Sequence, residues 1–141
     1  MRLINNKILE SLNRLINTNL EIQSGYKNAA DKVSDKNLKE IFIIYIQKIT
    51  EDINELKRME RDLAGGKKIV DHQLKKVPFP LDETDEISIL RICEKLEEKS
   101  IKGYEIILND EIPSSLKDIF VKQYNGLRDT RFHMKSLEDQ Y

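Results

Sequence analysis

A short pattern occurs twice in this sequence, 78 residues apart, and it constrains the fold more than any other feature. The dipeptide Gly25-Tyr26 returns at 103–104, and the run LKEIF at 38–42 returns as LKDIF at 116–120, with no gap between the two landmarks. A pattern that keeps its spacing over so long a stretch is typical of one supersecondary unit used twice. We therefore predict two copies of one helical hairpin.

Apolar residues recur at alternating steps of three and four, which is the spacing of one face of an α-helix. In the first segment this seam runs through Ile8, Leu12, Leu15, Ile22 and Tyr26. The same spacing predicts four helices, at about 3–33, 36–64, 83–110 and 114–139.

The connections between these helices are short, long and short. Residues 65–82 contain Gly65-Gly66, Pro78 and Pro80 and lose the helical period, so they form a crossover instead of a core helix. A link of this length can run along a bundle, which lets the third helix lie parallel to the second. The sequence thus predicts an all-α four-helix bundle, a single domain over 1–141, built from two antiparallel hairpins joined by the crossover.

Charge and composition exclude several classes of partner. The 141 residues include 24 Lys and Arg against 25 Asp and Glu, a net charge of -1, which gives no overall field to attract nucleic acid or anionic lipid. No apolar run reaches membrane-spanning length, and the N-terminus lacks the apolar core of a signal peptide. The single Cys93 excludes an internal disulfide and fits a reducing compartment. We expect a cytoplasmic protein without nucleic-acid or membrane partners.

Each apolar seam is interrupted near its middle by a polar residue: Asn19, Asp52, Glu97 and Thr130. The 78-residue offset relates Asn19 to Glu97 and Asp52 to Thr130. In an antiparallel hairpin, residues equidistant from the turn face each other. We therefore predict that the four side chains meet in one layer at the middle of the bundle.

The two carboxylates of this layer need partners. Burying an unpaired carboxylate is costly, so Asp52 and Glu97 must be hydrogen-bonded, protonated, hydrated or bound to a cation. Two interpretations stay open: a closed network of hydrogen bonds and water that fixes helix register, or a site for a metal or small ligand. The donors available on the same seams are Tyr26, Tyr45, Tyr104 and Gln123.

Two helical hairpins joined by a long crossover, with Gly-Tyr late in the first and third helices and acidic residues in a central layer, resemble the ferritin-like superfamily. The resemblance extends from Leu3 to Leu137. Within the superfamily the chain is most similar to small bacterial four-helix-bundle proteins of unknown function. The resemblance implies a ferritin-like fold.

The di-iron members of that superfamily carry a Glu on each of two helices and a Glu-x-x-His on each of the other two. Only two of the six matching positions are acidic here, and none is His. The resemblance therefore implies that a di-iron centre is lost, leaving at most a mononuclear site for Fe, Mn or Zn. The six matching positions are Asn19, Glu97, Ile49 with Asp52, and Leu127 with Thr130.

These observations favour a non-catalytic bundle over an enzyme. Nothing in the sequence resembles a nucleophile with its base, a phosphate-binding loop or a thiolate metal cluster. The bundle would act by association with another protein or with a second copy in a homodimer. The alternative is a metal-binding protein whose degenerate site derives from a di-iron carboxylate centre. Association needs an exposed apolar strip, for which the candidates are Ile43, Ile44, Ile46, Ile69 and Phe79.

Two histidines are secondary candidates. His133 lies one step off the fourth seam, where it is either a metal ligand together with Glu55 or a boundary histidine packed beside Phe132. His72 lies in the crossover among the lysines of 67–76, where it contacts a phosphate or acidic partner or belongs to a solvated connection.

Overall fold

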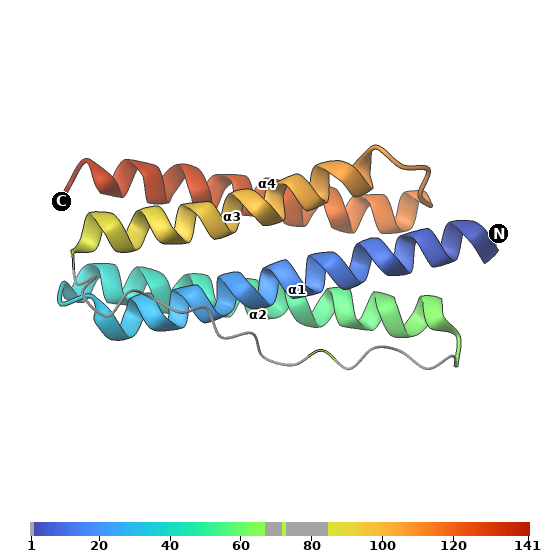
Figure 1. Ribbon diagram of the computed structural model, residues 1–141, viewed down its shortest axis with the longest axis horizontal. Coiled ribbons are helices and arrows are strands. Elements are labelled where there is room, and N and C mark those ends of the chain that lie inside the picture. Colours follow the sequence, from blue (N-terminus) through green and yellow to red (C-terminus); the bar gives the residue numbers. More distant parts are fainter. Residues whose placement is uncertain (1, 67–71, 73–84) are drawn as a thin grey trace.

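The computed structural model describes residues 2–66, 72 and 85–141. In this part of the chain the all-α prediction is confirmed. Two antiparallel hairpins, α1 with α2 and α3 with α4, lie one on the other (Figure 1). The helices are α1 (Arg2–Lys32), α2 (Lys36–Ala64), α3 (Glu86–Leu108) and α4 (Ser114–Glu138).

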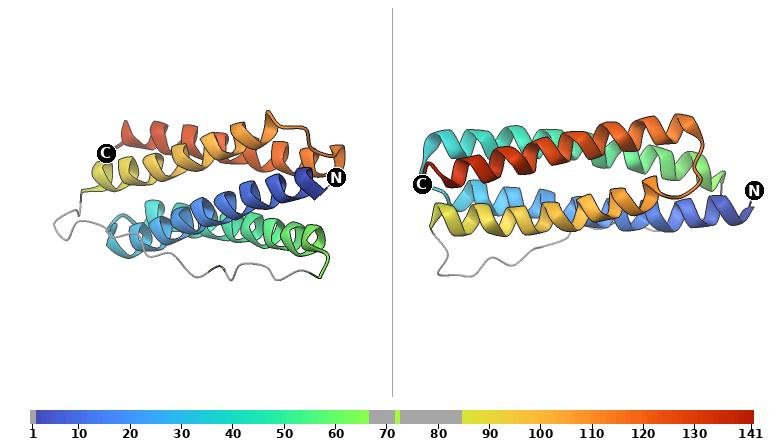
Figure 2. Two further views of the ribbon diagram at one scale, coloured as in Figure 1. Left: turned by 45° about the vertical axis from the view of Figure 1, so that its right-hand side comes forward. Right: turned by 90° about the horizontal axis from the view of Figure 1, so that it is seen from above.

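A long connection joins the two hairpins. The last residue of α2 and the first of α3 lie at opposite ends of the bundle, so these helices run in the same direction (Figure 1). Seen from above, α4 overlies α2 and α3 overlies α1 (Figure 2). The helix α1 packs against both α2 and α3, and α3 packs against α4, whereas α2 and α4 approach each other less closely. The interface between α2 and α4 is therefore more open than the other interfaces of the bundle.

Local sequence explains where the helices begin and end. Asp35 caps α2, because its side chain accepts a 2.9 Å hydrogen bond from the Leu38 backbone N–H. Gly65 and Gly66 follow that helix with φ of 56° and 90°, values that favour glycine. Tyr141 lies beyond the end of α4 at Glu138 and is exposed.

The predicted seams form the apolar core. Leu12, Ile22, Phe42, Leu90 and Phe120 are each at 0% exposure and come from all four helices. Burying such side chains supplies most of the free energy of folding. None of these four helices is long and apolar enough to cross a membrane.

Two glycines allow α1 and α3 to approach each other closely. A Cβ atom on Gly25 would lie 2.5 Å from the Leu96 Cδ1 atom, and a Cβ atom on Gly103 would lie 3.0 Å from the Leu15 Cδ2 atom. Each helix thus places a glycine against a leucine of the other. This close approach explains the glycine in both copies of the Gly-Tyr pair.

His72 attaches the connection to the first hairpin. Its Nε2 lies 3.0 and 2.9 Å from the two carboxylate oxygens of Glu60, and its Nδ1 lies 3.4 Å from the Asn17 Oδ1. The two side chains of the pair are only 3% and 5% exposed. The interpretation of His72 as part of a solvated connection is therefore wrong, because a buried carboxylate on α2 recruits it. The neighbouring lysines lie outside the described residues.

The glycines give a matched test of α1·α3 packing. A Cβ atom on Gly126, in the middle of α4, would meet nothing within 4 Å. Gly126→Ala should therefore raise the free energy of unfolding by about 0.5–1 kcal/mol, since alanine favours helix. Gly25→Ala carries the same propensity gain but must displace Leu96, so it should be less stable than Gly126→Ala by about 1–2 kcal/mol. Urea unfolding measures both. Equal stabilisation by the two changes would contradict the close packing.

Candidate functional site

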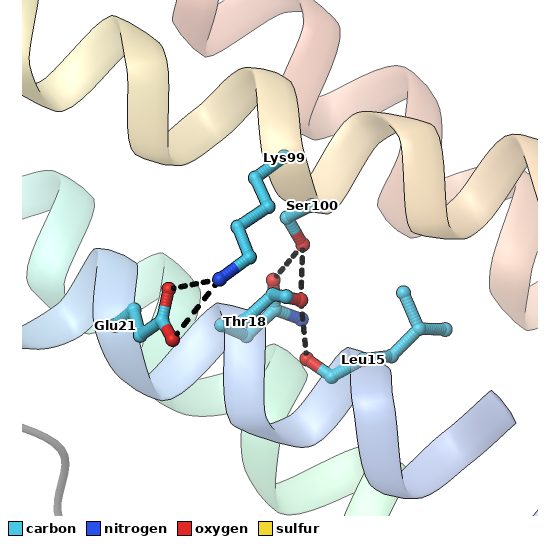
Figure 3. A network of polar contacts seen from close by, with 6 residues as sticks. Leu15, Thr18, Glu21, Lys99 and Ser100 are labelled. Carbon is cyan, nitrogen blue, oxygen red and sulfur yellow. Dashed lines mark hydrogen bonds and ion pairs between the residues drawn. The ribbon is translucent and has the colours of Figure 1, made fainter. Parts of the chain in front are cut away.

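The first half of the polar interior is a closed network around Asn19. The Asn19 Nδ2 donates to the Tyr104 hydroxyl at 2.9 Å, and the Ser100 hydroxyl donates to the Asn19 Oδ1 at 2.5 Å. Thr18 donates to the Ser100 oxygen at 3.1 Å, and these two side chains point toward each other between α1 and α3 (Figure 3). On the outer side of the same contact, Lys99 pairs with Glu21 (Figure 3). Both polar atoms of Asn19 are thus bonded within the protein.

The second half of the interior is centred on Glu97, and its hydrogen bonding is incomplete. The Tyr26 hydroxyl donates to the Glu97 Oε2 at 2.5 Å, and Glu97 is at 0% exposure. Its other oxygen, Oε1, is buried without a hydrogen-bond partner. The 78-residue offset converts the Tyr26–Glu97 contact into the Tyr104–Asn19 contact. The two contacts are therefore equivalent in position and different in chemistry.

The offset also explains the unpaired oxygen. Asn19 is completed by the hydroxyl of Ser100, and the position that the offset pairs with Ser100 is Ile22. Isoleucine has no donor, so the Glu97 Oε1 gains nothing from that position. A carboxylate in such surroundings loses its hydration without full compensation.

Burial controls the protonation of Glu97. Loss of hydration raises the pKa of this carboxyl to about 8, and the nearby Glu94 adds to the increase. The hydrogen bond from Tyr26 and the charge of Arg131 act in the opposite direction and are outweighed. The pKa of Tyr26 is itself raised, first by burial and then by Glu97. Glu97 is thus largely protonated near neutral pH.

The network continues from α3 into α4 and α2. The Tyr104 hydroxyl donates to the Gln123 Oε1 at 2.7 Å, and the Gln123 Nε2 donates to the Glu55 Oε1 at 2.8 Å. A separate contact between α2 and α4 is the hydrogen bond between the Tyr45 hydroxyl and the His133 Nδ1. The offset relates Tyr45 to Gln123 and His133 to Glu55. A second pair of contacts, now between α2 and α4, therefore obeys the spacing of the sequence repeat.

A groove of about 510 Å³ lies between α2 and α4. Asp52 faces this groove, and loss of hydration followed by repulsion from Glu55 raises the pKa of its carboxyl to about 6. Lys122 and Lys48 lower that pKa in part. The groove residues that belong to the polar interior are Tyr26, Tyr45, Asp52, Gln123 and Thr130.

The four residues predicted to form one layer are divided between two places. Asn19 and Glu97 lie between α1 and α3, each bonded to a tyrosine of the other helix. Asp52 and Thr130 lie at the groove, where the Thr130 hydroxyl donates to the Gly126 carbonyl at 3.0 Å. Of the predicted donors, Gln123 reaches the backbone carbonyl of Asp52 at 3.3 Å.

This division bears on whether a metal fits. Asn19 and Thr130 spend their polar atoms on protein partners, and Glu97 keeps one oxygen for Tyr26. Among residues 2–66, 72 and 85–141, no group of three or more His, Cys, Asp and Glu side chains is arranged to hold a metal ion. Hard divalent cations require several oxygen ligands, so these residues do not fit a di-iron centre and supply few free ligands to a single ion.

The secondary candidates have ordinary partners. His133 contacts Tyr45 instead of Glu55, which is bonded to Gln123. Cys93 is buried in the core, and burial raises the pKa of its thiol, which makes it a poor nucleophile.

Sequence analysis missed a carboxyl cluster beside Glu97. Glu94 is buried, and its pKa is raised to about 7 by burial and by a hydrogen bond to the Glu138 carboxyl. Glu94 precedes Glu97 by three residues, so the two share one face of α3. The three-residue spacing of Glu94 and Glu97 can be read from the sequence. The apolar seam passes through Glu97 and does not include Glu94.

Comparisons with known proteins identify the fold and no activity. No protein-family model matches the chain, and a search of curated proteins finds no match. One similar solved structure is that of a hypothetical protein from Pyrococcus furiosus, with a TM-score of 0.79 and 20% sequence identity, covering 93% of this chain and 87% of that chain. At this identity the similarity supports the shared all-α four-helix fold alone.

The buried carboxyl of Glu97 predicts a pH-dependent stability. Its pKa is about 8 when folded, against an ordinary value of 4.5, so the folded chain binds the extra proton between these values. This contribution is complete below about pH 4.5 and is lost as the pH rises through about 8. Between pH 5 and about 8.5, the native chain should lose on the order of a few kcal/mol more stability than Glu97→Gln, which does not titrate. Urea unfolding across that range measures the difference.

Two variants control this experiment. Glu40→Gln, on the exposed face of α2, should leave the pH profile unchanged. Ile22→Thr places a hydroxyl at the position equivalent to Ser100 and should flatten the profile by hydrogen-bonding the Glu97 Oε1. Parallel pH profiles for the native chain and Glu97→Gln would contradict the assignment of Glu97 as a buried, protonated acid.

Proposed function

We propose that the protein is a non-catalytic helical bundle that acts by associating with protein chains. The polar interior supports this proposal, because most of its hydrogen-bonding capacity is used within the protein. The network from Thr18 through Asn19 and Tyr104 to Gln123 and Glu55 consists of side-chain hydrogen bonds between helices. Networks of this kind fix helix register and hold no reacting group poised for a substrate.

The observation that carries the proposal is the set of large apolar side chains left in water. Phe132 is 78% exposed on α4, and Ile106, Ile44 and Ile43 are 58%, 52% and 46% exposed. Exposed phenylalanine is typical of protein-binding surfaces more than of surfaces that only face solvent. Of the other candidates from sequence, Ile46 packs partly against the core, and Ile69 and Phe79 lie outside the described residues.

We also propose that the fold is a ferritin-like bundle that arose by internal duplication. Support comes from the hydrogen bonds that the 78-residue offset relates in pairs, Tyr26–Glu97 with Tyr104–Asn19 and Tyr45–His133 with Gln123–Glu55. The single, buried Cys93 is consistent with a cytoplasmic location.

Photo-crosslinking in cells tests the association. A photoreactive phenylalanine analogue at position 132 should give one or a few discrete protein adducts, because a binding surface meets a defined partner. The matched control is Asn54, which the offset relates to Phe132 and which is exposed on α2. Adducts that are absent at 132, or equal at 132 and 54, would contradict a role in association.

The alternative function is binding of Fe, Mn or Zn. Two observations favour it: the Glu97 Oε1 is buried and unpartnered, and the pKa of Asp52 is raised. If these carboxyls hold a metal, stoichiometric metal should stay with the desalted native protein and be lost from an Asp52→Asn, Glu97→Gln variant, as measured by mass spectrometry. Metal-free native protein, or equal metal in both, would exclude this function.

A further inference from the structure

The outer side of the second hairpin carries a hollow next to a protruding aromatic side chain. A groove of about 940 Å³ lies between α3 and α4, and Phe132 lies on its border with 78% of its surface exposed. Tyr124 lines the same groove two helical turns earlier on α4. The groove could accept an apolar side chain such as Phe132. Within one copy of the chain, Phe132 does not fill it, because most of its surface stays exposed.

The charges around this groove are balanced. Lys102 and Arg131 each pair with Glu98 at 3.7 Å, and the Tyr124 hydroxyl donates to Glu105 at 2.8 Å. The Arg128 guanidinium lies over the Tyr124 ring, 5.5 Å from its centroid. The groove is therefore lined by three basic and three acidic side chains: Lys102, Arg128, Arg131, Glu98, Glu105 and Asp129.

This balance selects the kind of partner. A nucleic acid or a strongly acidic peptide would require an excess of basic charge, which the groove does not have. A two-fold interface brings the same patch of both subunits together, so it requires a surface that is complementary to itself. Equal numbers of opposite charges, with an apolar side chain beside a hollow, are compatible with that requirement.

We propose that this face binds a second copy of the chain in a two-fold dimer, with Phe132 of each copy in the α3/α4 groove of the other. The proposal rests on the proposed function and names its partner. When α4 of one copy lies antiparallel to α4 of the other, Phe132 of each lies over the Tyr124 end of the opposite groove. The Phe132 ring then packs against the stacked Arg128 and Tyr124 side chains of the other copy, and its surface is removed from water.

Sedimentation velocity over a wide range of protein concentration tests the dimer. The native chain should show a monomer–dimer equilibrium, and Phe132→Ser should raise the dissociation constant at least about tenfold. The matched controls are Ile44→Ser on α2 and Ile106→Ser on α3, which remove exposed apolar side chains outside this groove and should leave the constant unchanged. Circular dichroism and urea unfolding show whether each variant is folded.

Disulfide formation tests the register of the two chains. A Phe132→Cys chain mixed with a Tyr124→Cys chain should form a cross-linked dimer under mild oxidation faster than either chain alone. A mixture of Phe132→Cys with Asn54→Cys should not, and the native Cys93 is buried and does not interfere.

The outcomes separate this proposal from the more general function. A native chain that stays monomeric at all concentrations overturns the dimer, while discrete photo-adducts with another protein would still support association. A dimer that Phe132→Ser leaves intact and Ile44→Ser weakens overturns this face and keeps self-association.

Discussion

The close contact between α1 and α3 is the constraint on which the rest of the interior depends. Gly25 and Gly103 leave no room for a Cβ atom against Leu96 and Leu15, so the two helices approach until each tyrosine reaches across to the other helix. Tyr26 then meets Glu97, and Tyr104 meets Asn19. A wider spacing would leave these hydroxyls and their partners buried and unpaired, which costs more than the contacts contribute. The contact between α2 and α4 is looser, and a groove remains there.

The two halves of the interior share positions but differ in titration. Asn19 bonds through both of its polar atoms and cannot ionise, whereas Glu97 occupies the equivalent position with one oxygen free and a pKa of about 8. One further exchange adds to this difference, because Ser100 in one half corresponds to Ile22 in the other. The carboxyl of Glu97 makes the second half sensitive to pH, and the lack of a hydroxyl at position 22 leaves its Oε1 atom without a donor.

Most of the fold could be predicted from the sequence, because helical spacing and connection length are local properties. The apolar seams, the Asp35 cap and the glycine stop at Gly65 all follow from residues a few positions apart. The site could be predicted only in part. The offset relates Asn19 to Glu97, but it does not determine which side chains form hydrogen bonds with each other. Asn19 and Glu97 each bond to a tyrosine of the opposite helix, and Asn19 also bonds to Ser100. His72 could not be placed at all, because its partner Glu60 lies on a different element and only tertiary structure brings them together.

The hydrogen bonds of the interior leave few oxygen atoms free to bind a metal ion. A metal at mid-bundle would have to take oxygen ligands away from existing hydrogen bonds: from Tyr26 at the Glu97 Oε2, from Ser100 at the Asn19 Oδ1, and from the Gly126 carbonyl at the Thr130 hydroxyl. Each exchange leaves a buried donor or acceptor unpaired, which offsets the gain from coordination. Only the Glu97 Oε1 is both buried and free in this group. The outer face of α3 and α4 has the opposite character. Its ion pairs are long and largely exposed, and Phe132 has most of its surface in water, so a partner that covers this face displaces little and buries much.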